Sequence, residues 1–408
     1  MKKMLGLFLG VLTAIGGFVD IGDLVTQSVV GSRFGLSLVW VTVLSVVGIV
    51  VFAQMSGRVA AVSRRATFEI IRERLGPRLG FANLGASFLI NLLTLTAEIG
   101  GIALALQLAT SIAPGLWVPV AGAAVWIVLW RVKFKIMENV VGIVGLCLVA
   151  FTVAVFLLKP DWGQLGHSLV PSVPSGEHPS TYWYYAVSLF GAGLTPYEVF
   201  FFSSGAREER WTPRDLSLSR ANVFLGFPLG GAVSLSNCVC ATLVLLPLGI
   251  QVSSLSQVVL PVAQAGGAIL VIVLILGIVA ATFGAALETC LSSGYTIAQY
   301  FGWSWGKFRR PAQAARFHVV LIVSLLVSLG ILATGADPVQ VTEASVVLSA
   351  LALPLTYLPI LIVANDRQYM GEHVNGRVMN AFGLVFLALI VVASVASIPL
   401  LIISGMGA

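Results

Sequence analysis

Charged side chains are scarce in this chain of 408 residues, of which Asp, Glu, Lys and Arg together make up 10%. An average soluble domain has roughly 25%, so this low content excludes a soluble enzyme and a disordered tail protein. Cysteine is also rare, with four residues, which excludes a disulfide scaffold. The four histidines form no nucleophile triad or helical metal motif. We therefore expect neither an enzyme nor a bound cofactor.

Long runs of hydrophobic residues make up most of the sequence. Hydrophobic residues make up 58% of the chain, and its mean hydropathy is +0.99. A helix of about 20 apolar residues crosses a hydrocarbon core of about 30 Å. We interpret 261–300 as one long helix with extensions, because its centre has no strong turn signal. Eleven spans are predicted, at 4–30, 36–57, 81–112, 116–130, 136–158, 182–206, 222–246, 261–300, 317–334, 341–364 and 378–403.

The basic residues predict the orientation of these spans. With the N-terminus inside, all of the 23 lysines and arginines except Arg33 and Lys159 fall in cytoplasmic segments. This asymmetry is the one that orients membrane proteins, and it predicts a cytoplasmic N-terminus and an outer C-terminus. It also explains the net charge of +6 without a nucleic-acid partner. The short outer loops favour a bacterial inner membrane.

Five carboxylates lie well within the predicted spans, whereas no lysine or arginine does. A carboxylate inside a bilayer is costly and marks a functional site by default. Five of them without a basic partner require protonation or a neutralising cation. The pattern therefore predicts a cation site or a proton path built from Asp20, Asp23, Glu98, Glu198 and Glu288.

Glycine and proline interrupt two of these spans beside the carboxylates. Residues 16–17 precede the acidic segment 20–23, and 191–193 run into the segment 195–198, which contains Pro196. Such breaks free backbone carbonyls, which are tolerated at mid-membrane only inside protein or along a cavity. Interrupted spans at matching places in two halves are typical of transporters with inverted repeats.

The two breaks open two sets of five spans. An odd number of spans per set makes the second set inverted in the membrane, and the last span is an addition. We therefore predict one all-α polytopic membrane domain over 1–408. Its parts are a first repeat at 4–158 (helices 1–5), an outer connecting loop at 159–181, a second repeat at 182–364 (helices 6–10) and helix 11 at 378–403.

Several motifs resemble those of the Nramp family of divalent-metal transporters. Residues 20–23 (Asp-Ile-Gly-Asp) resemble its Asp-Pro-Gly-Asn motif in helix 1, and 96–100 resemble its helix 3 signature. Residues 195–197 (Thr-Pro-Tyr) stand where the family has Met-Pro-His in helix 6. Segments 292–299 and 346–375 resemble its helices 8 and 10. The resemblance covers most of the chain and implies the LeuT-type fold with broken helices 1 and 6.

Departures from the family motifs concern the cargo. Thr195 replaces a methionine that supplies a soft thioether, and Asp23 replaces an asparagine. Glu288 stands at a position that is often glutamine, and Ala352 replaces a glutamine, which predicts a larger site. Oxygen ligands and added negative charge suit a hard cation, and Mg²⁺ is usually bound with several waters. These departures resemble the Nramp-related magnesium transporters, although Mn²⁺ and Ca²⁺ accept the same ligands.

Proton coupling is also affected. Tyr197 replaces the family's histidine, and Leu95 stands where the family has an acid before Glu98. A phenol does not titrate near neutral pH, whereas an imidazole does. We therefore expect uncoupled alternating-access transport into the cytoplasm. The expected cargo is hydrated Mg²⁺, with Mn²⁺ as a second cargo. Glu98 is retained, so residual proton coupling stays open.

The resemblance and the residues together give a set of site predictions. The expected partners are divalent metal ions and the lipid bilayer, with no protein partner evident. Asp20 is the expected main ligand, and Glu98 and Tyr197 are assigned to an inner route or to coupling. The expected metal site comprises Asp20, Asp23, the backbone at Ala192, Thr195, Glu198 and Glu288.

Two alternatives remain open. The first is a proton-coupled Mn²⁺ or Fe²⁺ importer of the ordinary Nramp type. The second is a non-transporting membrane sensor or binding protein on the same fold, which we would expect to carry an appended soluble domain. The longest segments outside the spans are only 58–80 and 159–181. We interpret 58–80, with its six arginines, as an ordinary cytoplasmic loop in preference to a short amphipathic helix.

Overall fold

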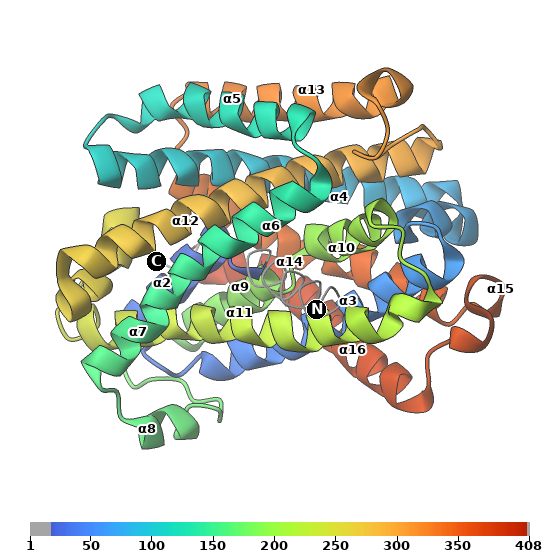
Figure 1. The fold of residues 1–408 in the computed structure, drawn as a ribbon. Coiled ribbons are helices and arrows are strands. Elements are labelled where there is room, and N and C mark those ends of the chain that lie inside the picture. Colours follow the sequence, from blue (N-terminus) through green and yellow to red (C-terminus); the bar gives the residue numbers. More distant parts are fainter. Residues whose placement is uncertain (1–17, 406–408) are drawn as a thin grey trace.

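The computed structural model describes residues 18–405, and all regular secondary structure within them is helical. Figure 1 shows the helices packed around a centre where α2, α9 and α14 lie. The principal elements are α2 (Ile21–Phe34), α3 (Val39–Ser63), α4 (Thr67–Thr110), α5 (Pro114–Arg131), α6 (Phe134–Gly145), α7 (Val149–Leu158), α9 (Pro179–Gly193), α10 (Pro196–Glu208), α11 (Leu216–Val244), α12 (Leu255–Phe301), α13 (Ala315–Ala333), α14 (Pro338–Ala364) and α16 (Arg377–Ile403).

Nine helices in the described part of the chain are long and apolar enough to cross a membrane, with α6 and α7 joined as one span through a 3₁₀ turn at Leu146–Leu148. The two remaining predicted spans are the broken ones, whose described halves α2, α9 and α10 are each too short to cross a bilayer alone. The chain thus has the helices of a multi-pass membrane protein, as its sequence predicts. Helix α4 packs between α12 and α14, and α2 packs against α11.

The break in the sixth span is confirmed. Helix α9 ends at Gly193, and α10 begins at Pro196. Proline lacks a backbone N–H, so it cannot continue the ladder of the preceding helix but is well suited to the first turn of the next. Leu194 and Thr195 therefore connect two half-helices inside the protein, where both residues are buried.

The break in the first span is confirmed on its described side. Helix α2 begins at Ile21, and Asp20 caps it by accepting a hydrogen bond of 2.8 Å from the backbone N–H of Asp23. Aspartate is among the preferred N-cap residues because its carboxylate satisfies an amide that the helix leaves free. Residues 16–17, the other part of this prediction, lie outside the described residues.

Two segments differ from the sequence prediction. The span at 261–300 is not one helix, because α12 is interrupted at Gly267 (φ 64°, ψ −160°). A positive φ strongly favours glycine, and the glycine pair at 266–267 was the signal for this break that sequence reasoning missed.

The interpretation of 58–80 as a loop is also wrong. Residues 67–75 are helical up to a second break at Gly76 (φ 82°), which supports the short-helix alternative.

The segment 159–181, which the sequence predicts to be an outer loop, contains the short helix α8 (Trp162–His167). Another short helix, α15 (Arg367–Met370), follows α14 and precedes α16 in the chain. Helices α5 and α13 lie side by side at one edge of the molecule, at the top of Figure 1. None of these elements contributes to the small cavity at the helix breaks, whose described lining comes from Asp20, α2, α4, α9, α10, α14 and the α9–α10 connection.

Candidate cation site

A small cavity lies where the two helix breaks meet. Its walls come from the start of α2, from α4, from both sides of the α9–α10 break and from α14, and its volume is about 20 Å³. That volume holds about one water molecule. The polar side chains that line it are those of Asp20, Thr94, Glu98, Thr195, Tyr197, Thr342, Ser345 and Ser349.

Asp20 joins the two breaks. One carboxylate oxygen, Oδ1, accepts the amide of Asp23 at 2.8 Å, and the other, Oδ2, accepts a hydrogen bond of 3.2 Å from the hydroxyl of Tyr197 on α10. The side chain is buried, with 4% of its surface exposed. Both contacts hold the carboxylate at the cavity, and its role as the main ligand stays a prediction.

Glu98 lies in the same cavity, in the C-terminal half of α4. Its Oε1 accepts a hydrogen bond of 3.1 Å from the backbone N–H of Ile21, the first residue of α2. Its Oε2 is buried and has no hydrogen-bond partner among the described residues. A buried carboxylate oxygen without a partner is costly, so this atom is available to a proton or a cation. The structure thus places Glu98 beside Asp20 in the central cavity, and its assignment to an inner route or to coupling stays a prediction.

The break in the sixth span contributes Ala192 and Thr195, which both line the cavity. In a continuous helix the carbonyl of Ala192 would accept the N–H four residues on. That residue is Pro196, which has no N–H. The carbonyl of Ala192 therefore lacks its usual helical partner, and its role as a backbone ligand stays a prediction.

Asp23 is not in the cavity. Its carboxylate accepts hydrogen bonds from the hydroxyl of Ser234 on α11 and from the side-chain amide of Gln27 at 3.2 Å. These contacts place Asp23 in the packed interface between α2 and α11. The sequence predicts a ligand here because Asp20 and Asp23 share a motif, but a partner 211 residues away holds the second carboxylate.

Glu198 and Glu288 are not in the cavity either. Glu198 lies in the first turn of α10 and Glu288 near the middle of the second part of α12, and their carboxyl groups contact each other. No cluster of three or more potential metal-binding acidic, His or Cys side chains occurs in residues 18–405. The predicted ligand set therefore divides into the central cavity, the Asp23 interface and the Glu198–Glu288 pair.

Sequence reasoning missed the polar side of α14. Ser345 and Ser349 line the cavity, and the hydroxyl of Ser345 lies 2.8 Å from that of Thr94 on α4. Thr342, Ser345 and Ser349 recur at helical spacing, and this stripe was the available signal. Ala352, which was expected to enlarge the site, is buried but does not line the cavity. The prediction of a roomy site is not met in this conformation.

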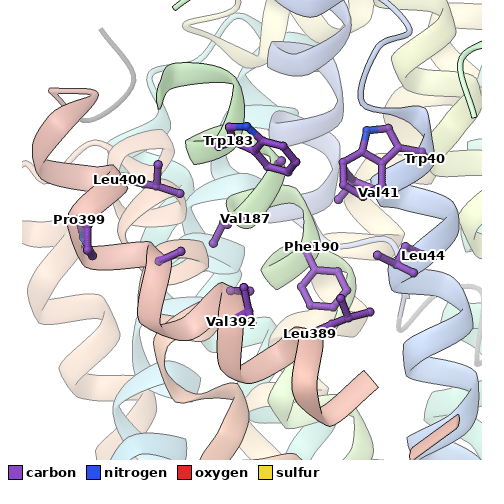
Figure 2. Close-up of a pocket in the computed structure, with 13 residues that line it drawn as sticks. Trp40, Val41, Leu44, Trp183, Val187, Phe190, Leu389, Val392, Pro399 and Leu400 are labelled. Carbon is purple, nitrogen blue, oxygen red and sulfur yellow. The ribbon is translucent and has the colours of Figure 1, made fainter. Parts of the chain in front are cut away.

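A larger groove elsewhere is chemically unsuited to cations. It has a volume of about 450 Å³ and lies between α3, α9 and α16. Figure 2 shows Trp40 and Trp183 at one end and Phe190, Leu389 and Val392 along its walls. Every lining side chain is hydrocarbon or indole, and such walls cannot replace the water around an ion. The small polar cavity is therefore the better candidate.

Solved structures of similar fold include several transporters. A mutant of the manganese transporter of Eremococcus coleocola is 19% identical, with a TM-score of 0.73; the match covers 95% of this chain and 85% of that one. Mhp1, a nucleobase-cation-symport-1 family transporter, is 16% identical with a TM-score of 0.63 over 97% and 91%. MhsT with L-phenylalanine is 17% identical with a TM-score of 0.62 over 97% of each chain.

These structural similarities establish the fold, and a match to a family model establishes which family the chain belongs to. The model described as natural resistance-associated macrophage protein-like (Nramp) matches residues 10–399. That range includes both breaks, the cavity and the helices that surround them. A transporter is thus indicated in place of an enzyme, as the sequence predicts. The chain belongs to the Nramp family of divalent-metal transporters.

Proposed function

We propose that this transporter moves hydrated divalent cations, Mg²⁺ in the first place and Mn²⁺ in the second, into the cytoplasm by uncoupled alternating access. One observation carries the proposal: every polar side chain that lines the central cavity offers oxygen. No methionine, cysteine or histidine takes part in the described lining. Oxygen donors suit Mg²⁺, Ca²⁺ and Mn²⁺, whereas thioether and imidazole favour softer transition metals.

The donor set proposed for the ion comprises the carboxylate of Asp20, the carbonyl of Ala192 and the hydroxyl of Thr195. Glu98 adds a second carboxylate, with one oxygen free of hydrogen bonds. Mg²⁺ is commonly held through one or two carboxylates with several waters retained. A cavity of about 20 Å³ is too small for a hydrated ion. Entry of the hydrated ion therefore requires a wider conformation, reached by movement of α2, α9 and α10.

The absence of proton coupling is proposed from Tyr197 and Leu95. Tyr197 is 1% exposed and its phenol donates to Asp20, so no imidazole titrates at this contact. Leu95 is buried in an apolar cluster with Ile99 and Ile102, where a second acid would be needed for a relay. A membrane potential contributes about 2.3 kcal/mol per charge for each 100 mV, so roughly 4.6 kcal/mol for a dication. A negative-inside potential can therefore drive entry unaided.

We further infer the repeat boundaries and the orientation given by the sequence, with the N-terminus in the cytoplasm, the C-terminus outside and a bacterial inner membrane as location. The halves 4–158 and 182–364 each begin with a broken span, and the segment 159–181 connects them. Arg64 and Arg65 between α3 and α4, and Arg309 and Arg310 after α12, then all lie on the cytoplasmic side.

A second candidate function is the proton-coupled Mn²⁺ or Fe²⁺ importer. The free Oε2 of Glu98 beside Asp20 favours it, because an unpartnered buried carboxylate is suited to carry a proton. The fold shared with a manganese transporter is compatible with both candidates. The two differ in cargo and in proton movement, which can be measured separately.

The proposal is tested by ion uptake into liposomes containing the purified full-length protein, under a negative-inside potential. Mg²⁺, Ca²⁺, Mn²⁺ and Cd²⁺ are compared at equal concentrations, with Asp20→Asn as the inactive control. We expect Mg²⁺ and Mn²⁺ to enter and Cd²⁺, a soft ion, to enter least. Uptake of Cd²⁺ and Mn²⁺ without Mg²⁺ would overturn the proposed selectivity. A lack of uptake of all four ions would favour the non-transporting alternative.

A further inference from the structure

Glu198 and Glu288 form a carboxyl pair that the central cavity does not use. Glu198 comes from α10 and Glu288 from α12, and their side chains are close enough to share a hydrogen bond. They are 4% and 6% exposed, respectively. Neither residue belongs to the lining of the central cavity. The pair is therefore not part of the described cavity lining, although Glu198 is close enough to Asp20 to interact with it electrostatically.

No described donor compensates the charge of this pair. The Oε2 atoms of both residues are buried without a hydrogen-bond partner in the described part of the chain. Two carboxylates in contact cannot both stay ionised without a counter-charge. Either they share a proton, or a cation lies between them. The unpartnered oxygens are the feature that points to a ligand.

Stabilisation of a helix end by a negative charge explains the position of Glu198 but not that of Glu288. Glu198 is the third residue of α10, where a negative charge is favoured by the helix dipole. Glu288 is far from both ends of the long helix α12 and has no such advantage. An acid in mid-membrane beside a second acid is expensive, so its presence needs a function.

A third acid extends the pair toward one end of the molecule. Glu138 on α6 interacts electrostatically with both Glu198 and Glu288, and α12 packs against both α6 and α10. Glu138 lies one turn after the basic segment 131–135. In the proposed orientation that segment is cytoplasmic, so the acids lead inward from the central cavity. Glu208, further along, is engaged by the hydroxyl of Tyr295 and by backbone amides.

We propose that Glu198 and Glu288 form a second divalent-cation site, inward of the Asp20 cavity, which receives the hydrated ion after it leaves the centre. Two carboxylates and retained waters match the way in which Mg²⁺ is usually held. The inference rests on the proposed function, because it takes the cargo of the central site as its ligand. A second site lowers the cost of moving a dication between mid-membrane and the cytoplasm, since its charge is never left uncompensated.

The test is a count of bound ions, with Mn²⁺ as the paramagnetic probe and Mg²⁺ as competitor, on the purified full-length protein. Four variants are compared with the wild type: Asp20→Asn, the double variant Glu198→Gln/Glu288→Gln, the combination of all three changes, and Glu372→Gln. Glu372 lies on the surface outside the spans, so its variant controls for loss of negative charge. Glu288→Gln alone replaces the double variant if that variant does not fold.

We expect two Mn²⁺ ions per wild-type chain and per Glu372→Gln chain, both displaced by Mg²⁺. Asp20→Asn and the double variant should each retain one ion, and the combined variant none. A double variant that binds as many ions as the wild type would show that the pair only shares a proton, which overturns the second site. If Asp20→Asn keeps both ions while the double variant loses one, the proposed central site fails and the second site stands.

Discussion

The hydroxyl of Tyr197 donates a hydrogen bond of 3.2 Å to Oδ2 of Asp20. The two residues stand beside different helix breaks, 177 positions apart in the chain. The contact therefore connects the first broken helix to the sixth at the candidate cation site. In this position a neutral phenol holds the ligand carboxylate without offering a group that titrates near neutral pH.

Asp20→Asn is expected to abolish transport while the fold is kept. Asparagine is as good an N-cap as aspartate, so the start of α2 is preserved while the charge is lost. Even indirect partners of a metal typically contribute 10- to 100-fold, so we expect Mg²⁺ uptake into liposomes to fall at least about 100-fold. Asp20→Ala should lose uptake too, with about 1 kcal/mol of additional destabilisation from the lost cap. Normal flux in either variant would remove Asp20 from the site.

Thr195→Met should shift selectivity toward softer metals. The Thr195 side chain lines the cavity at the break, and a thioether there would exchange a hard donor for a soft one. We expect uptake of Mn²⁺ and Cd²⁺ to rise relative to Mg²⁺ in competition assays. Thr195→Val is the matched control, since it removes the hydroxyl without adding sulfur. If methionine and valine have the same effect, Thr195 does not act through its donor atom.

Tyr197→His should make transport sensitive to pH. An imidazole beside Asp20 titrates near pH 6.5, and its charged form would repel a dication. We therefore expect Mg²⁺ uptake by the variant to decrease, relative to the wild type, as the pH falls from about 8 to about 6. Tyr197→Phe removes the hydrogen bond to Asp20 without adding a titrating group, so its pH profile should follow the wild type. Identical profiles for the histidine and phenylalanine variants would contradict the assignment.

Lys307 provides a pH-dependent contribution to stability outside the spans. Its Nζ donates to the carbonyls of Val128 and Leu129 at the end of α5, at 3.1 and 2.9 Å. Burial lowers the pKa of Lys307 to about 8, although the charge of Glu208 opposes the shift. In the unfolded chain the pKa is about 10.4. Between these values the unfolded state binds more protons, so this residue makes the protein more stable as the pH rises.

Thermal unfolding in detergent at pH 8 and pH 10 measures this contribution. The wild type should gain stability over this interval relative to Lys307→Met, whose unbranched side chain is one heavy atom shorter and cannot titrate. An equal change in both proteins, or a greater gain in the methionine variant, would show that the amine is not deprotonated in the folded state.

Some features were predictable because their cause is local. The break before Pro196 follows from a missing N–H, and the spans follow from the length of the apolar runs. Asp20 was predictable for the same reason, since an aspartate beside a break caps the next half-helix. The family resemblance added the fold, which local patterns alone left open.

Other features depend on partners distant in the chain. Asp23 was expected at the cation, but Ser234 on α11 engages its carboxylate, and no local pattern indicates that contact. The serines of α14 enter the cavity because α14 packs against α4, which the sequence of α14 does not encode by itself. The break at Gly267 was missed because glycine is common in membrane helices.

The most direct test of the account follows cation entry and internal pH together in the same liposomes. Mg²⁺ and Mn²⁺ are added in parallel under a negative-inside potential, with a pH-sensitive dye enclosed. The account predicts Mg²⁺ entry without acidification of the interior, and no change of that outcome when a pH gradient is imposed. Entry of Mn²⁺ alone, accompanied by acidification, would contradict it and would establish proton-coupled transport of the ordinary Nramp type.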